Sequence, residues 1–280
     1  MRHRITTSRG LRPGDFDSVL GLQRVCEAAD GLHLKLEPAP AHGGGHIDTA
    51  LAWDGDELAG YCGVDFGIDA EVCGMVRPDR RRAGCGGALL LAAREMAAAA
   101  IRESVLVICE DASPMALAWL RRLGATVAHS ELRMLLPMAE RRRGSVHAVR
   151  LRRAQPEDRD QVISILAEGF DEPPGSIGAP ALDETLVALD GERIVGTTRL
   201  VRSPQRWMIY GFVVEKAVRG RGFGRAMLDA TLDMLAADGV DEVGLEAETT
   251  NTPALRLYAS AGFEPVTTYR YMRLGADLRT

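Results

Sequence analysis

Apolar residues of the first half recur at spacings that predict strands and helices in alternation. Helical spacing extends over about 14–29, and the segments around it show the period of two that is typical of strands. In chain order we predict a strand near 5–11, the helix over 14–29, strands at 49–53, 58–66 and 71–76, a helix to about Arg102, a strand at 105–109, a helix at 114–123 and strands within 125–136.

The second half repeats this order of elements. It predicts a strand at 147–152, a helix at 156–169, strands at 184–189, 193–201 and 207–214, a helix to Asp238, a strand at 243–248, a helix at 252–261 and strands to Leu274. The pattern indicates an α/β (α+β) fold class, with a mainly antiparallel sheet flanked by helices in each half.

A turn rich in glycine joins the strand that ends at Val214 to the next helix. Because Gly220, Gly222 and Gly224 have no Cβ atoms, successive N–H groups can converge on an anion. The new helix directs the positive end of its dipole to the same place. Positive charge is added by Arg219, Arg221 and Arg225. The stretch predicts a phosphate site.

The spacing of this turn excludes two common nucleotide motifs. The dinucleotide pattern G-x-G-x-x-G fails, because Arg225 stands three residues after Gly222. A P-loop would need G-x-x-x-x-G-K-[ST], which does not occur at the turn. What remains is Arg219-x-x-Gly222-x-Gly224 after an apolar strand.

The same pattern occurs earlier in the chain, as Arg81-x-x-Gly84-x-Gly86. Gly224 follows Gly86 by 138 positions, and the same offset separates Arg219 from Arg81. This repeat indicates a gene duplication. At 280 residues the chain has the length of about two domains. We therefore predict an N-terminal domain over 1–140 and a C-terminal domain over 146–280.

Charge and composition narrow the possible partners. A net charge of −5 argues against general nucleic-acid binding, and the basic run 141–143 in the predicted linker is interpreted as a solvated charge cluster. The apolar segment 88–101 contains Arg94 and Glu95, so we expect an ordinary helix and no membrane span. The N-terminus lacks an apolar signal-peptide core, which predicts a cytoplasmic protein.

Cysteine and histidine spacings do not predict a metal site. The five cysteines lie in the first half without a zinc pattern, and they are interpreted as buried thiols; Cys85 in the first turn is a packing residue rather than a nucleophile. His42 and His46 lack a convincing third and fourth ligand nearby.

The glycine turn and a later segment together resemble a known family. Arg219-x-x-Gly222-x-Gly224 resembles the acyl-CoA pyrophosphate loop of the GNAT superfamily of N-acetyltransferases. The segment from Asn251 through Tyr258 to Phe263 resembles the N-x-x-A-x-x-x-Y-x-x-x-G-F segment of the same family. The repeat extends the resemblance over most of the chain, in an architecture similar to that of the tandem mycothiol synthases.

The resemblance implies acetyl-CoA as co-substrate, bound where the fourth and fifth strands of a sheet splay apart. It implies a backbone donor for the thioester oxygen on the strand before the turn, which also pairs with the pantetheine arm. The implied contacts in the second half are Phe212, Val213, Val214, Arg219, Gly220, Arg221, Gly222, Phe223, Gly224, Arg225 and Asn251. Those in the first half are Met75, Val76, Arg81, Arg82, Gly84, Gly86 and Gly87.

The resemblance also implies a pair of proton-transfer residues. Amine-acetylating relatives use a glutamate as general base and a tyrosine as general acid at the positions of Glu246 and Tyr258 here. The offset of 138 places Ile108 and Leu120 at the matching first-half positions, and Ser113 in place of Asn251. We therefore assign catalysis to the second half.

Other interpretations of these residues stay open. Asn251 is also a good helix N-cap, Tyr258 could be a core residue, and Glu246 could be one acidic residue of an exposed strand. Rival bases or amine anchors are Glu168, Asp171 and Glu172. Met208 stands where histone-acetylating relatives place a glutamate, which weakens a protein-lysine acceptor.

The predicted function is acetyl transfer from acetyl-CoA to a primary amine of a small molecule or peptide, by direct attack on the thioester. Two alternatives remain: a tandem module that senses acyl-CoA without turnover, and transfer of another acyl group or to a hydroxyl. We predict a monomer or homodimer that needs no metal.

Overall fold

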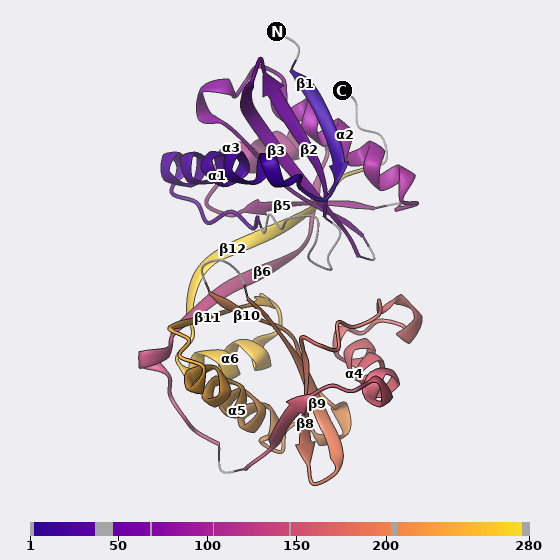
Figure 1. Cartoon of the computed structure of the whole chain (residues 1–280), viewed down its shortest axis with the longest axis vertical. Coiled ribbons are helices and arrows are strands. Elements are labelled where there is room, and N and C mark those ends of the chain that lie inside the picture. Colours follow the sequence, from indigo (N-terminus) through magenta and orange to yellow (C-terminus); the bar gives the residue numbers. More distant parts are fainter. Residues whose placement is uncertain are drawn as a thin grey trace. The chain divides into compact units, whose positions relative to one another are not determined.

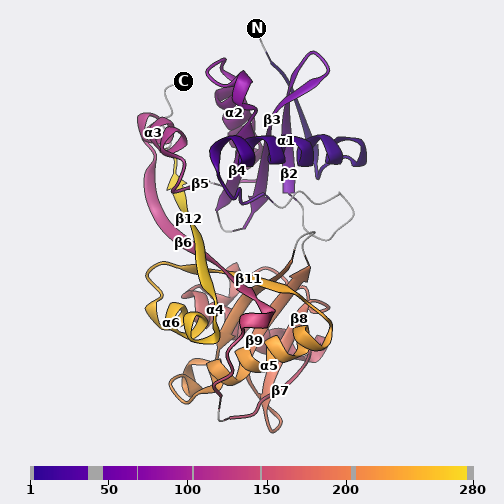
Figure 2. The same cartoon turned by 90° about the vertical axis from the view of Figure 1, so that its left-hand side faces the viewer.

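The computed structural model describes residues 3–36, 47–67, 69–102, 104–145, 147–202 and 206–275. The chain folds into two compact units (Figures 1 and 2). Unit 1 consists of residues 1–130 and 267–280, and unit 2 consists of residues 131–266. His42 and His46 lie outside the described residues.

The sheet of unit 1 is antiparallel except at one pair of strands. It has the order β1 (Arg4–Arg9), β2 (Ile47–Asp54), β3 (Glu57–Phe66), β4 (Ala70–Val76), β5 (Val105–Glu110) and β12 (Glu264–Arg273). The parallel pair is β4 and β5. The neighbour of β5 on its other side is thus the last strand of the chain, paired antiparallel from Tyr269 onward.

Two apolar cores lie on opposite faces of this sheet. The helix α1 (Phe16–Asp30) covers one face, and α2 (Cys85–Ala99) and α3 (Pro114–Arg122) cover the other (Figures 1 and 2). Alternation along β2 separates the cores: Leu51 packs with α1, whereas Ala50 and Ala52 face α2.

Unit 2 repeats this sheet with its own strands. The order is β6 (Thr126–Pro137), β11 (Glu242–Glu248), β10 (Trp207–Val214), β9 (Arg193–Arg202), β8 (Thr185–Asp190) and β7 (Arg150–Arg153). The parallel pair is β10 and β11, and the other registered neighbours are antiparallel. The predicted fold class, a mixed and mainly antiparallel sheet with helices on both faces, is confirmed.

The helices of unit 2 occupy faces equivalent to those of unit 1. On one face α5 (Phe223–Ala237) and α6 (Thr252–Ala261) enclose a core around Leu228, Leu232 and Tyr258. On the other face α4 (Arg159–Phe170) packs Val162 and Ile165 against the sheet. Among the described helices, none is long and apolar enough to cross a membrane.

One long strand follows the last helix of each repeat, where the sequence predicted more than one. Neither β6 nor β12 contains an internal turn residue pair that would reverse the chain, so each continues from one unit into the other. Residues 131–137 of β6 pair with β11 in unit 2, and residues 269–273 of β12 pair with β5 in unit 1. The two compact units therefore differ from the halves 1–140 and 146–280 by these strand segments.

The placement of β12 predicts a stability effect that can be measured. Met272 is fully buried in the core of unit 1, so Met272→Ala should lower the free energy of unfolding by about 2–5 kcal/mol in denaturant titrations. Val266→Ala on the same strand removes a half-exposed side chain and should cost about 0.5 kcal/mol or less. Equal small effects of the two changes would contradict this packing.

Candidate functional site

The two central parallel strands part in each unit. In unit 2 the register of β10 and β11 runs from Trp207 opposite Val243 to Ile209 opposite Leu245. In unit 1 the register of β4 and β5 ends at Val72 opposite Val107. Beyond these points the two parallel strands no longer pair with each other. The backbone groups that face the opening are therefore available to hydrogen-bond an extended ligand.

Only the strand of unit 2 carries an irregularity at this opening, within the described residues. The register between β10 and β9 shifts between Tyr210 and Val213, and Gly211 there has φ of +54°. The matching strand of unit 1, β4, keeps continuous register with β3 from Ala70 to Val76. A bulge turns backbone groups out of the ladder, so the predicted segment at Phe212 differs in geometry from its counterpart.

Both glycine turns have the same backbone. Gly84 and Gly222 are N-caps of α2 and α5, and each has φ of +87°, which favours glycine. The guanidinium of Arg81 donates from Nε to the carbonyl of Val76 at 3.0 Å, and Arg219 donates in the same way to Val214 at 2.9 Å. The repeat found in the sequence is thus a repeat of conformation.

The turn of unit 1 opens onto a large cavity. The cavity has a volume of about 630 Å³, within the range of small-molecule sites, and reaches from the turn through the opening between β4 and β5. Its walls include the predicted residues Met75, Val76, Arg81, Arg82, Gly84, Gly86 and Gly87. Arg81 also forms an ion pair with Asp30 on α1, with Nη2 at 2.6 Å from Oδ2.

The cavity of unit 1 lacks the proposed proton-transfer groups. Ile108 and Leu120 line it at the positions that match Glu246 and Tyr258. Cys85, at the start of α2, is buried, and burial raises the pKa of its thiol to about 11. A thiol that stays protonated at neutral pH is a poor nucleophile, which agrees with a packing role.

Tyr258 of unit 2 lies under the opening, between two aromatic rings. Its ring meets those of Phe212 and Phe263 edge to face, with centroids 5.9 Å apart in each case. Burial raises the pKa of Tyr258, so the hydroxyl keeps its proton through neutral pH. Within the described residues this hydroxyl has no hydrogen-bond partner. Tyr258 is therefore both a core residue and an available proton donor.

Glu246 lies one residue beyond the last registered pair of β10 and β11. Leu245 and Ala247 face the core with Tyr258, so the alternation of β11 places Glu246 on the other face of the strand. Its carboxylate is buried, with a side chain 5% exposed, and pairs with Arg133 of β6. The alternative interpretation of Glu246, as one acidic residue of an exposed strand, is therefore wrong, and the sequence did not identify Arg133 as its partner.

Two of the three rival carboxylates have local hydrogen-bond partners. Glu168 accepts a hydrogen bond from the backbone N–H of Lys216 at 2.9 Å, and Glu172 accepts from the Ser176 hydroxyl at 3.2 Å. Asp171 ends α4 in the left-handed conformation, with φ of +56°. Asn251 caps α6, where its Oδ1 accepts from Ala254 N–H at 3.2 Å.

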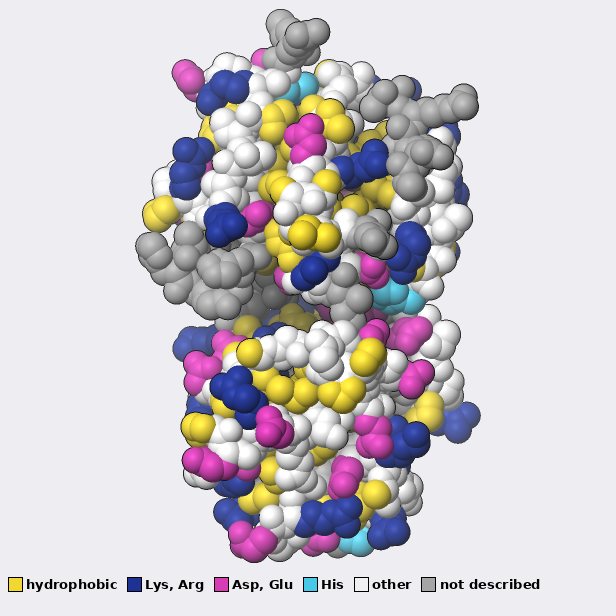
Figure 3. Space-filling view, turned by 90° about the vertical axis from the view of Figure 1, so that its right-hand side faces the viewer, with side chains coloured by type: hydrophobic (Ala, Val, Ile, Leu, Met, Phe, Trp, Pro, Cys, Tyr) yellow, Lys and Arg dark blue, Asp and Glu magenta, His cyan; other side chains and the backbone are white. Residues whose placement is uncertain are grey.

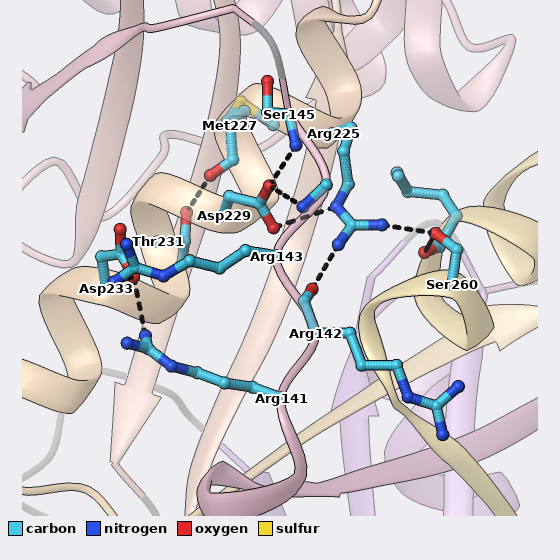
Figure 4. Close-up of polar contacts among 12 residues, drawn as sticks. Arg141, Arg142, Arg143, Ser145, Arg225, Met227, Asp229, Thr231, Asp233 and Ser260 are labelled. Atoms are coloured by element: carbon cyan, nitrogen blue, oxygen red, sulfur yellow. Dashed lines mark hydrogen bonds and ion pairs between the residues drawn. The ribbon is translucent and has the colours of Figure 1, made fainter.

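Arg225, predicted to contact the cofactor, joins the linker to α5 and α6 (Figure 4). Its Nε lies 2.9 Å from Oδ1 of Asp229, and its Nη1 donates to the Ser260 hydroxyl at 2.8 Å. Its Nη2 donates to the carbonyl of Arg142. The other oxygen of Asp229 accepts from the N–H groups of Gly144 and Ser145. All three nitrogens of the Arg225 guanidinium thus bond to other residues of the protein.

Two arginines of the basic run 141–143 also form ion pairs with α5. Arg141 and Arg143 both pair with Asp233 of α5, at 2.7 Å and 2.6 Å (Figure 4). Arg142 and Arg143 are exposed, as expected for a solvated charge cluster, but the sequence did not indicate that Asp233 pairs with two arginines of this run. Further along the linker, His147 stacks on Phe223, and a Cβ added to Gly222 would lie 2.7 Å from its ring.

Charge elsewhere is mixed in sign. On the face shown in Figure 3, lysine and arginine side chains lie among aspartate and glutamate side chains, without one continuous basic surface. Among the described residues there is also no group of three or more histidine, cysteine or carboxylate side chains that could hold a metal ion.

The linker network predicts a specific loss of stability. Asp229→Ala removes the acceptor of Arg225, Gly144 and Ser145, so the free energy of unfolding should fall by about 1–3 kcal/mol. Asp238→Ala removes an exposed carboxylate at the C-cap of the same helix and should change it by about 0.5 kcal/mol or less. Indistinguishable denaturation midpoints would show that the network adds no stability.

Comparisons with known proteins agree with this geometry. The model of the Acetyltransferase (GNAT) family matches residues 152–263. A mycothiol acetyltransferase of Clavibacter sepedonicus is 33% identical over 276 residues, which cover 90% of this chain and 89% of that protein.

Solved structures show the same fold over the whole chain. A GCN5-related N-acetyltransferase from Sphaerobacter thermophilus has a TM-score of 0.74 at 21% identity and covers 96% of this chain and 95% of its own. A tandem GNAT protein from the clavulanic acid biosynthesis pathway has a TM-score of 0.69 at 16% identity, with coverage of 98% and 100%. The chain belongs to the GNAT family of acetyltransferases, as an enzyme that transfers acetyl from acetyl-CoA to an amine.

Proposed function

We propose that acetyl transfer takes place in unit 2, at the opening between β10 and β11. The observation that carries this assignment is the difference between the repeats. Unit 2 combines a bulged strand with Glu246 and Tyr258, whereas unit 1 has a regular strand with Ile108 and Leu120.

The diphosphate of acetyl-CoA would be held by the turn of unit 2. The N–H groups of residues 219–225 and the dipole of α5 favour an anion there, and Arg219 and Arg221 add positive charge. The pantetheine arm would pair with the strand Phe212–Val213–Val214. Arg225 would contribute indirectly, because its guanidinium holds the linker against α5 and α6.

The reaction would proceed by direct attack of the amine nitrogen on the thioester carbonyl. An aliphatic ammonium has a pKa near 10, so Glu246 would accept its proton, directly or through water. The C–N bond forms, the tetrahedral intermediate collapses, and the C–S bond breaks. A thiolate with pKa of about 8.5 would then take the proton of Tyr258 as negative charge develops on sulfur. The second proton of the nitrogen would leave to solvent as the amide forms, and Tyr258 would regain a proton from solvent. A backbone N–H of the bulged strand would stabilise the oxyanion.

For the acceptor we propose the amine form of mycothiol that lacks its acetyl group. The support is the similarity to proteins named mycothiol acetyltransferase, which extends over 90% of this chain. Release of free thiol from acetyl-CoA should be fastest with this amine in a panel that also contains glucosamine and a peptide with a free amino terminus. Faster turnover of another amine would overturn the acceptor. No turnover with any amine would favour the sensing alternative.

The general acid is tested by Tyr258→Phe, which keeps the ring and removes the proton donor. We expect kcat to fall at least tenfold, with the KM for acetyl-CoA within about twofold of wild type, because each such role is worth about 10²–10⁴. Tyr258→Leu reproduces the residue found at Leu120 of unit 1 and should show at least the same loss. Wild-type turnover in Tyr258→Phe would remove the acid role.

We propose in addition that unit 1 binds acetyl-CoA without catalysis. Its turn has the same backbone as that of unit 2, and its cavity of about 630 Å³ extends from that turn.

Calorimetry with CoA tests both turns. Wild type should bind two molecules per chain, and Gly84→Glu and Gly222→Glu should bind one each, since the two glycines have the same φ and a side chain there would oppose the anion. If Gly222→Glu loses all CoA binding while Gly84→Glu binds CoA as wild type does, unit 1 does not bind CoA. Melting temperatures verify that both variants fold.

A further inference from the structure

Unit 2 contains a strand from the first repeat. Residues 131–137 of β6 precede the linker, yet they pair with β11 along its whole length, from Glu248 opposite Glu131 to Glu242 opposite Pro137. In this register Arg133 is the direct partner of Glu246. The residue next to the proposed base therefore comes from the repeat that lacks the proton-transfer pair.

Arg133 and Glu246 form a buried ion pair. Nη2 of Arg133 lies 2.7 Å from Oε1 of Glu246, and Nε lies 2.9 Å from the same oxygen. The side chains are 13% and 5% exposed. An ionised carboxylate removed from water to this extent needs an opposite charge or several hydrogen bonds. Arg133 supplies a charge and two N–H donors, so it fixes where the carboxylate lies.

The pair is placed at the point where the strands part. Leu245 is the last β11 residue in register with β10, and Glu246 follows it directly. In unit 1 the equivalent cross-strand partners are Ile108 and Tyr271, which carry no opposite charges. The ion pair is therefore a property of the unit to which catalysis is assigned, and not of the repeat in general.

We propose that Arg133 is a positioning residue for acetyl transfer, which holds the Glu246 carboxylate in place and directed at the opening. The inference rests on the proposed function. During the reaction the substrate ammonium gives one proton to Glu246, which passes it to solvent, and the guanidinium of Arg133 keeps its proton throughout. The first repeat thus contributes to catalysis through its last strand.

The experiment compares Arg133→Met with wild type in the full chain. With the amine of the panel that wild type acetylates fastest, kcat should fall at least tenfold, while the KM for acetyl-CoA stays within about twofold. Arg206→Met is the matched control, because Arg206 pairs with Glu242 on the same face of β11 at 3.1 Å. The control should keep kcat within about twofold.

Two further readouts separate positioning from general loss of structure. Millimolar guanidine hydrochloride, far below denaturing concentrations, should restore part of kcat to Arg133→Ala and none to Glu246→Gln. Arg133 acts through Glu246, so the double variant Arg133→Met/Glu246→Gln should be no slower than Glu246→Gln alone. Arg133→Lys, which keeps a charge but not the planar fork, should fall between wild type and Arg133→Met.

Each outcome decides a different claim. An active wild type with unchanged kcat in Arg133→Met, or a double variant slower by the product of both single effects, overturns the role of Arg133 alone. A wild type without turnover for any amine overturns the proposed function, and this inference with it. If Arg133→Met does not fold, Arg133→Lys and the guanidine response of Arg133→Ala decide the matter, because a structural defect would not respond to the added cation.

Discussion

The parting of two parallel strands is the constraint on which the rest of this structure depends. Once β10 and β11 separate after Leu245, backbone groups that would complete a ladder need another partner. The bulge at Gly211 takes backbone groups out of the regular ladder with β9, and the glycine turn brings amide hydrogens together where α5 begins. A ligand with an amide-rich arm and a diphosphate could hydrogen-bond both the strand backbone at the opening and the N–H groups of the turn.

The two repeats depend on each other through strands rather than through copies of one site. The last strand of the chain completes the core of unit 1 with Tyr269 and Met272, and a strand of the first repeat lies beside Glu246 in unit 2. A repeat with Ile108 and Leu120 in place of the proposed proton-transfer residues can therefore still be required by the enzyme. Its own cavity, open between β4 and β5, would serve binding.

Much of this could be predicted from the sequence, for physical reasons. Glycine adopts a left-handed conformation that other residues rarely adopt, so the same spacing of glycines at two strand-to-helix turns, 138 residues apart, predicted the same geometry twice. Partners brought together by pairing of distant strands could not be predicted, because no local pattern encodes them. In the sequence Arg133 is an ordinary strand arginine, and only the register of β6 with β11 shows that it lies opposite Glu246. Asp229 is likewise an ordinary helix carboxylate in the sequence, four residues after Arg225.

Hydrogen–deuterium exchange of the full chain, with and without acetyl-CoA, tests the central claim most directly. The account predicts slower exchange in peptides that contain residues 212–214 and 219–225, where amide hydrogens are proposed to meet pantetheine and diphosphate. It also predicts little change in the outer strands β7 and β8. If acetyl-CoA binds with measurable affinity while these two segments exchange at unchanged rates, the turn and the bulged strand are not where the cofactor lies.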